Sequence, residues 1–119
     1  MALTMTLRTL SEVVILHLSG RLCFLEFELR NKITALLEDG YRDFILNMED
    51  VSHIDSFGLG QLFSVRASVH NRGGQLVLLR PIERVRMVLQ IKKLQMLFQI
   101  FQDEREAADY LLGALAISG

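Results

Sequence analysis

An aspartate, a serine and two glycines lie close together near the middle of the chain, in the stretch Ile54-Asp55-Ser56-Phe57-Gly58-Leu59-Gly60. Aspartate and serine are preferred at the amino end of a helix, where free backbone N–H groups and the helix dipole also attract anions. Ser56 is therefore a candidate for one of two roles. It could cap the helix, or its hydroxyl could carry or hold a phosphate.

The two glycines fall where this helix begins, although each costs roughly 1 kcal/mol relative to alanine inside a helix. Because glycine has no side chain, Gly58 and Gly60 would expose backbone that a ligand or another protein can approach closely. The alternative is that they allow the helix to pack tightly against a sheet. The pattern leaves both interpretations open.

The surrounding sequence predicts alternating strands and helices. Apolar runs indicate strands at 4–10, 13–18, 43–48, 75–79 and 97–101, and apolar residues three or four apart indicate helices at 24–37, 56–72, 81–89 and 104–112. This order predicts an α/β fold with mainly parallel pairing and right-handed crossovers. Functional loops in such folds lie at the carboxyl ends of strands, which is where Ser56 falls.

Turn and cap residues set the expected boundaries of these elements. Gly20 is expected to close the turn after the second strand, and Gly40 to follow the first helix as a C-cap residue. The chain is expected to turn through 49–50 after the third strand. Pro81 suits the first turn of the third helix, and Asp103 suits the N-cap of the last one.

Length and composition restrict the class of protein. A chain of 119 residues with 50% hydrophobic residues predicts a single domain over 1–119, with its core at about 4–116. A net charge of -1 gives no electrostatic reason to expect a nucleic acid partner. The lone Cys23 and the absence of a long apolar segment predict a reduced, cytoplasmic protein without a signal peptide or membrane insertion.

The stretch at 54–60 resembles the D-S-[ST]-G-L-G signature of the STAS family, which includes bacterial anti-sigma factor antagonists and the tails of sulfate transporters. The resemblance extends over about 4–116, through DFILNMEDVSHI and NRGGQLVLLRPIERVRMVLQ. It implies a mixed, mainly parallel sheet with about four helices. It also implies a non-enzymatic module without a cofactor.

In the STAS family, a serine kinase that doubles as an anti-sigma factor phosphorylates the motif serine, and a phosphatase removes the phosphate. The resemblance therefore implies phosphorylation at Ser56 and a switch that frees a sigma factor when the unmodified domain sequesters its partner. The oligomeric state stays open. The implied partner-binding residues are Asp55, Ser56, Phe57, Gly58, Leu59 and Gly60.

Two positions depart from the family pattern. Cys23 stands where the family often has the aspartate of G-x-L-D, and Phe57 replaces a serine or threonine. An exposed aromatic ring at Phe57 could anchor a partner. These departures leave open one alternative, a STAS subunit of a lipid or solute ABC-transport complex without phosphorylation. A second alternative is a module that holds a nucleotide phosphate at the amino end of the helix, although no G-x-G-x-x-G or P-loop pattern is present.

Other chemistry has little support in the sequence. A serine hydrolase would need glycine where Ile54 stands, so no catalytic residues are expected. His17, His53 and His70 lack the spacing of metal ligands, and each is expected to be solvated or hydrogen-bonded. No metal site is predicted, and Cys23 is expected to be structural.

Overall fold

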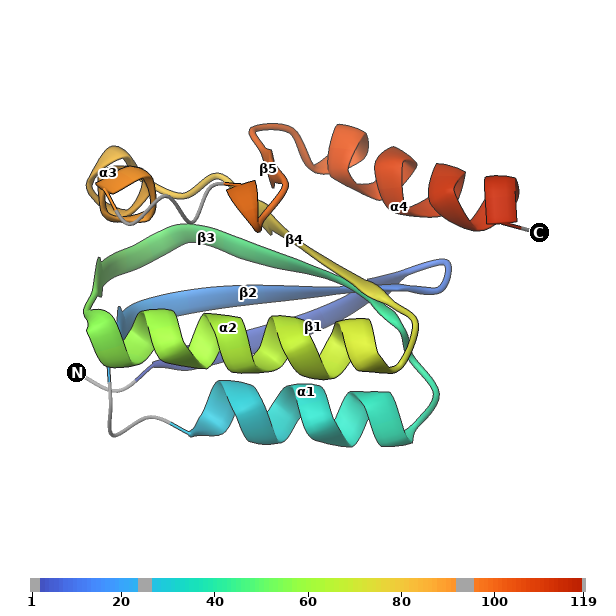
Figure 1. Ribbon diagram of the computed structural model, residues 1–119, viewed down its shortest axis with the longest axis horizontal. Coiled ribbons are helices and arrows are strands. Elements are labelled where there is room, and N and C mark those ends of the chain that lie inside the picture. Colours follow the sequence, from blue (N-terminus) through green and yellow to red (C-terminus); the bar gives the residue numbers. More distant parts are fainter. Residues whose placement is uncertain (1–2, 24–26, 92–95, 119) are drawn as a thin grey trace.

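The computed structural model describes residues 3–23, 27–91 and 96–118. Strands and helices alternate after an initial strand pair, as the sequence predicts (Figure 1). The elements in chain order are β1 (Thr4–Leu10), β2 (Val13–Leu22), α1 (Glu28–Glu38), β3 (Asp43–Ile54), α2 (Ser56–Asn71), β4 (Gln75–Leu79), α3 (Glu83–Ile91), β5 (Ile100–Phe101) and α4 (Glu104–Ser118).

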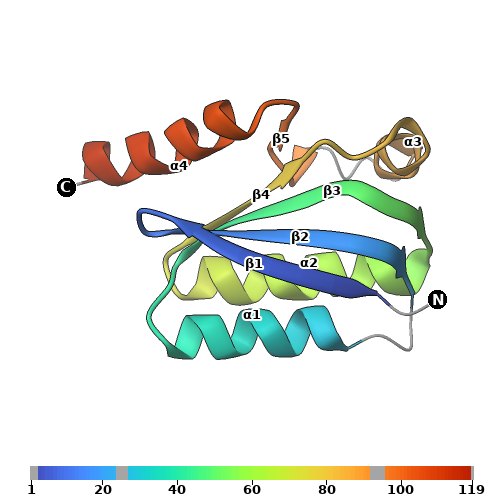
Figure 2. The same ribbon diagram turned by 180° about the vertical axis from the view of Figure 1, so that it is seen from behind.

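The strands of the described residues form one five-stranded sheet in the order β1-β2-β3-β4-β5. β1 is antiparallel to β2, and the other neighbouring pairs are parallel. Figures 1 and 2 show α1 and α2 side by side on one face of the sheet and α4 on the opposite face. The prediction of a mainly parallel α/β fold with about four helices is confirmed.

The central strands are buried on both faces, which explains their continuous apolar sequences. Alternate residues of β2 point to opposite sides: Val14 and Leu16 belong to the core beneath α1 and α2, whereas Val13 and Ile15 pack beneath α4. β3 repeats this arrangement. The sheet is therefore held by two apolar layers, and its buried strands hold the loops at their carboxyl ends in place.

Both central strands are longer than the sequence predicts. Gly20 does not close a turn, because β2 continues to Leu22 and Gly20 lies within the strand at φ 113°. β3 likewise continues past 49–50 to Ile54. His17 pairs with Asn47 and Ser19 with Asp50, so a β-bulge accommodates one extra residue of β3. The polar residues that suggested a turn occupy this bulge.

Other boundaries differ by smaller amounts. α1 begins at Glu28 rather than at 24, and the first three residues of the predicted helix, 24–26, lie outside the described residues. Pro81 precedes α3 instead of lying in its first turn, because the backbone N–H of Arg86 bonds to the carbonyl of Ile82. The last strand is limited to Ile100–Phe101.

The predicted caps of two helices are confirmed. Gly40 follows the C-cap of α1 with φ 101°, a conformation that favours glycine. The Oδ2 atom of Asp103 accepts a hydrogen bond from the backbone N–H of Glu106 at 3.0 Å, as an N-cap does. None of the described helices combines the length and the apolar content needed to cross a membrane.

Asp43 links the first residues of β3 and β4. Its side chain is only 6% exposed, and its Oδ1 atom accepts a hydrogen bond from the Gln75 N–H at 3.0 Å. Burial raises the pKa of Asp43 above its ordinary value; Glu12 adds to this effect, and the bond from Gln75 opposes it. The folded chain thus holds this proton more tightly than the unfolded chain does.

This raised pKa predicts a pH dependence of stability. The free energy of unfolding should fall as pH rises from the ordinary carboxyl pKa through the raised value, because ionisation costs more in the folded state. Asp43→Asn keeps an acceptor for Gln75 and should lose this decrease. Asp43→Ala should be about 1–3 kcal/mol less stable at every pH, because it leaves a donor without its partner. Urea unfolding between acidic and neutral pH measures both effects, and an unchanged pH slope in Asp43→Asn would contradict the prediction.

Candidate functional site

The motif lies at the edge where β2 and β3 end together. Leu22 and Ile54 form the last residue pair of these parallel strands. Asp55 follows directly, and α2 begins at Ser56, as the sequence predicts. The side chains of Asp55, Ser56 and Phe57 are exposed at this edge. The fold therefore presents the serine at the carboxyl edge of the sheet and at the amino end of a helix.

Asp55 caps α2. Its backbone is extended at φ -111° and ψ -176°, and its Oδ1 atom accepts a hydrogen bond from the Gly58 N–H at 2.8 Å. Ser56 occupies the first helical position, and its hydroxyl makes no hydrogen bond to the part of the chain that the structure describes. Asp55, and not Ser56, therefore caps the helix. The serine hydroxyl is exposed and bonds to no group in the described ranges, so it is available for modification.

Gly58 packs against the backbone of β2. A Cβ atom at this position would lie 2.1 Å from the carbonyl oxygen of Leu22 and 3.0 Å from Cγ1 of Ile54. The expectation that Gly58 exposes backbone to a partner is wrong, because the residue is buried and is glycine for packing reasons. Leu59 is also buried, at 6% exposure, and its side chain belongs to the core rather than to a surface.

Gly60 differs from Gly58 in its surroundings. A Cβ atom built on Gly60 meets no heavy atom within 4 Å, and the residue is exposed. Helical periodicity explains the contrast, because positions three and four apart share a face. The buried face of α2 is formed by Gly58, Leu59, Gln61, Leu62, Val65 and Val69. The surface of the motif consists of the four remaining predicted residues, Asp55, Ser56, Phe57 and Gly60.

A chain of hydrogen bonds joins α3 to the end of β3. Arg84 lies 3.1 Å from Nε2 of His53, and Nδ1 of His53 lies 3.0 Å from the Ser52 hydroxyl. An arginine can only donate, so Nε2 accepts and Nδ1 carries the proton. Ser52 in turn donates to the carbonyl of Gly20 at 3.2 Å. The expectation of a hydrogen-bonded structural histidine is confirmed for His53.

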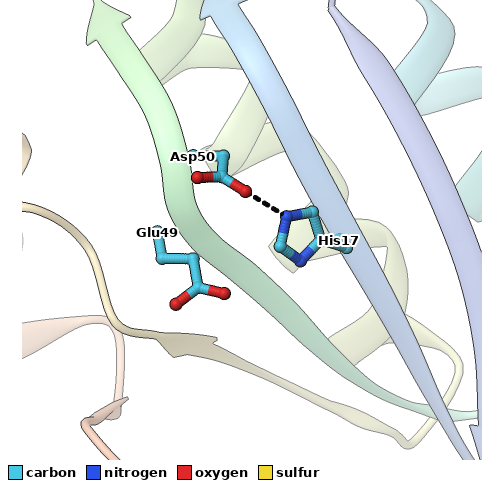
Figure 3. A group of neighbouring side chains, drawn as sticks. All are labelled: His17, Glu49 and Asp50. Carbon is cyan, nitrogen blue, oxygen red and sulfur yellow. Dashed lines mark hydrogen bonds and ion pairs between the residues drawn. The ribbon is translucent and has the colours of Figure 1, made fainter.

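A second histidine, His17, lies close to two carboxylates. The spacing of these residues in the sequence did not predict this proximity. Figure 3 shows His17 of β2 facing Glu49 and Asp50 of β3, and one ligand-type atom of each lies within 4.8 Å of the others. Nε2 of His17 is 2.6 Å from Oδ2 of Asp50, and Arg80 lies 3.5 Å from Oε2 of Glu49. The bulge turns both acidic residues to the same face. His17 contacts Asp50 and Arg80 contacts Glu49, so the three residues of the cluster belong to a polar network on this face of the sheet.

Comparison with known proteins identifies the family. The sequence model described as the STAS domain matches residues 4–107 of this chain. The chain belongs to the STAS domain family. This match includes Ser56 and all of the predicted motif residues.

Relatives of this STAS domain are named as antagonists of anti-sigma factors. A protein of Thermotoga neapolitana, provisionally assigned as an anti-sigma factor antagonist, is 38% identical over 77 residues, which are 65% of this chain and 68% of the relative. The anti-sigma-B factor antagonist of Staphylococcus aureus is 30% identical over 73 residues, 61% of this chain and 68% of the relative. The structure of the anti-sigma factor antagonist SpoIIAA in its unphosphorylated form is similar, with a TM-score of 0.79, 28% identity and coverage of 92% and 97%. A phosphorylated form of the Bacillus protein is also similar, with a TM-score of 0.70, 28% identity and coverage of 90% and 98%.

Cys23, one of the two departures from the family pattern, helps to hold α2 in this STAS domain. The Nε2 atom of Gln61 donates to the Cys23 carbonyl at 2.6 Å. Cys23 is partly buried, and its backbone rather than its side chain makes the contact. The other departure, Phe57, is 61% exposed. The backbone of Cys23 therefore takes part in a structural contact, whereas Phe57 places an aromatic ring on the surface of the motif.

The contrast between the glycines predicts opposite effects of one substitution in this STAS domain. Gly58→Ala should lower the free energy of unfolding by at least about 1–3 kcal/mol, because its Cβ atom would collide with backbone. Gly60→Ala should raise stability by up to about 1 kcal/mol, because alanine favours the helix and meets open space. Urea unfolding followed by circular dichroism measures both values. Equal effects at the two positions would show that Gly58 is not a packing constraint.

Proposed function

We propose that this STAS domain is an anti-sigma factor antagonist controlled by phosphorylation of Ser56. In its unmodified form it binds a kinase-like anti-sigma factor and thereby frees a sigma factor. The observation that carries the proposal is the position of Ser56, which is exposed at the first residue of α2 beside an independent cap. The names of the relatives support the same class of function.

The local electrostatics favour a phosphate on the free domain. A phosphoserine carries about -1.5 to -2 charges at pH 7, and the amino end of a helix stabilises negative charge. The modified side chain would stay in water at this exposed position. A partner that covers Ser56 would have to desolvate this charge, and the Asp55 carboxylate would add like-charge repulsion at the interface. Phosphorylation should therefore prevent binding while leaving the fold intact.

A binding module fits the site better than an enzyme. No histidine or carboxylate of the described residues forms a hydrogen bond with the Ser56 hydroxyl, so nothing in that part of the chain activates it as a nucleophile. The chemistry would come from the kinase partner and from a phosphatase that resets the switch. We propose that the domain acts in the cytoplasm, without a cofactor and without contact to nucleic acid.

Two substitutions of Ser56 test the proposal. Ser56→Ala should bind the kinase-like anti-sigma factor of the same organism with wild-type affinity but accept no phosphate from ATP. Ser56→Asp should bind more than about tenfold more weakly, because a carboxylate imitates part of the phosphate charge. Both variants should keep the wild-type circular dichroism spectrum. Calorimetry measures the affinity, and mass spectrometry of the incubated protein locates the phosphate.

Ser68→Ala, which alters another serine of α2 outside the motif, is the matched control and should accept phosphate as the wild type does. Phosphate on a residue other than Ser56 would overturn the assignment of the switch. If the wild type binds the anti-sigma factor but takes no phosphate, regulation by Ser56 is wrong. If it binds neither phosphate nor anti-sigma factor, the alternative of a STAS subunit in an ABC-transport complex gains support.

A further inference from the structure

A groove opens between the amino ends of α1 and α2. The two helices lie side by side with their amino ends at the same end of the molecule (Figures 1 and 2). A depression of about 340 Å³ lies between them, lined by Phe27, Arg30, Phe57, Gly60, Gln61 and Ser64. Phe57 directly follows Ser56, so the groove adjoins the proposed switch.

The sides of the groove are apolar and exposed. Phe27 is 55% exposed and Phe57 is 61% exposed, and Gly60 contributes no side chain between them. Two partly exposed aromatic rings beside a glycine are typical of surfaces that receive a partner side chain, because covering their exposed area removes apolar surface from water. The space above Gly60 is open, so a bulky aliphatic side chain can enter without a change in the helix.

Gln61 is a fixed part of the lining. The residue is only 8% exposed, and its Nε2 atom donates a hydrogen bond to the Cys23 carbonyl. Its Oε1 atom has no hydrogen-bond partner in the described structure and is also closed off from solvent. A partner therefore cannot reach this atom while the side chain keeps its position. The hydrogen bond from Nε2 holds this part of the groove in place, so an occupant can pack on a preformed surface.

The groove also has a charge. Arg30 is exposed, and it forms no ion pair within the described residues. A guanidinium group at the edge of an apolar groove complements a carboxylate on a partner. The chemistry of the occupant follows from two features: an aliphatic side chain for the rings and a carboxylate for Arg30.

We propose that this groove binds a segment of the anti-sigma factor that presents a bulky aliphatic side chain and a neighbouring carboxylate. This proposal rests on the proposed function, because the same partner covers Ser56. The groove explains the departure at position 57, where a phenylalanine provides apolar area in place of a small hydroxyl. It assigns partner recognition to α1 as well as to α2.

Substitutions in the groove test the proposal against the kinase-like anti-sigma factor of the same organism. Phe27→Ala and Gly60→Leu should each weaken binding about tenfold or more, because one removes a side of the groove and the other fills it. Phe27 makes no side-chain cap bond and Gly60 faces open space, so both variants should fold. The double variant should lose less than the product of the two single losses, since both act on one contact. Arg30→Gln should weaken binding and reduce its dependence on salt.

Matched controls carry the same types of change elsewhere in the chain, at two exposed positions and one partly exposed position. Met87→Ala and Arg86→Gln alter α3, and Gly113→Leu fills open space on α4. All three should bind as the wild type does. If Ser56→Asp abolishes binding while the groove variants bind normally, the groove proposal is wrong and the proposed function stands. If the wild type does not bind the anti-sigma factor, both are wrong. Losses in the controls equal to those in the groove variants would also overturn the groove.

Discussion

The close approach of α2 to the backbone of β2 determines the geometry of the site. At Gly58 the helix lies so near Leu22 that even a methyl group would meet the carbonyl oxygen. Once this contact is made, the rotation of the helix about its axis is fixed. Leu59 must then enter the core, and Ser56 must face solvent. One turn later, Gln61 reaches the carbonyl of Cys23, which extends the same seam between helix and strand.

This arrangement separates structural tasks from surface chemistry within a few consecutive residues. Asp55 satisfies a backbone donor and Gly58 permits the packing, so neither task depends on Ser56. A charge added to the serine changes what a partner meets and leaves the cap and the core contacts in place. If Ser56 itself capped the helix, phosphorylation would compete with folding. Because Asp55 is the cap, a change of affinity can occur without a loss of stability.

The order of the elements could be predicted from the sequence because β2 and β3 are buried on both faces, so their apolar runs are continuous. Their lengths could not be predicted. In the bulge of β3, Glu49 and Asp50 both face outward while Met48 and Val51 stay in the core, and this breaks the alternation by which a strand is recognised. Likewise, the motif predicted Ser56 at a helix start but could not distinguish Gly58 from Gly60. Their difference depends on Leu22, which is remote in sequence.

The groove could not be predicted for the same reason, since Phe27 and Phe57 come together only through the pairing of α1 with α2. Its lining nonetheless connects partner binding to the contact between α2 and β2, because Gln61 belongs to both. The Gln61 amide nitrogen donates to the Cys23 carbonyl, and the same residue lines the groove beside Gly60. A partner that packs on the groove would shield this hydrogen bond from water, and a hydrogen bond is electrostatically stronger where the local dielectric is low. The contact between α2 and the end of β2 would thus be strengthened as the surface that presents Ser56 is covered.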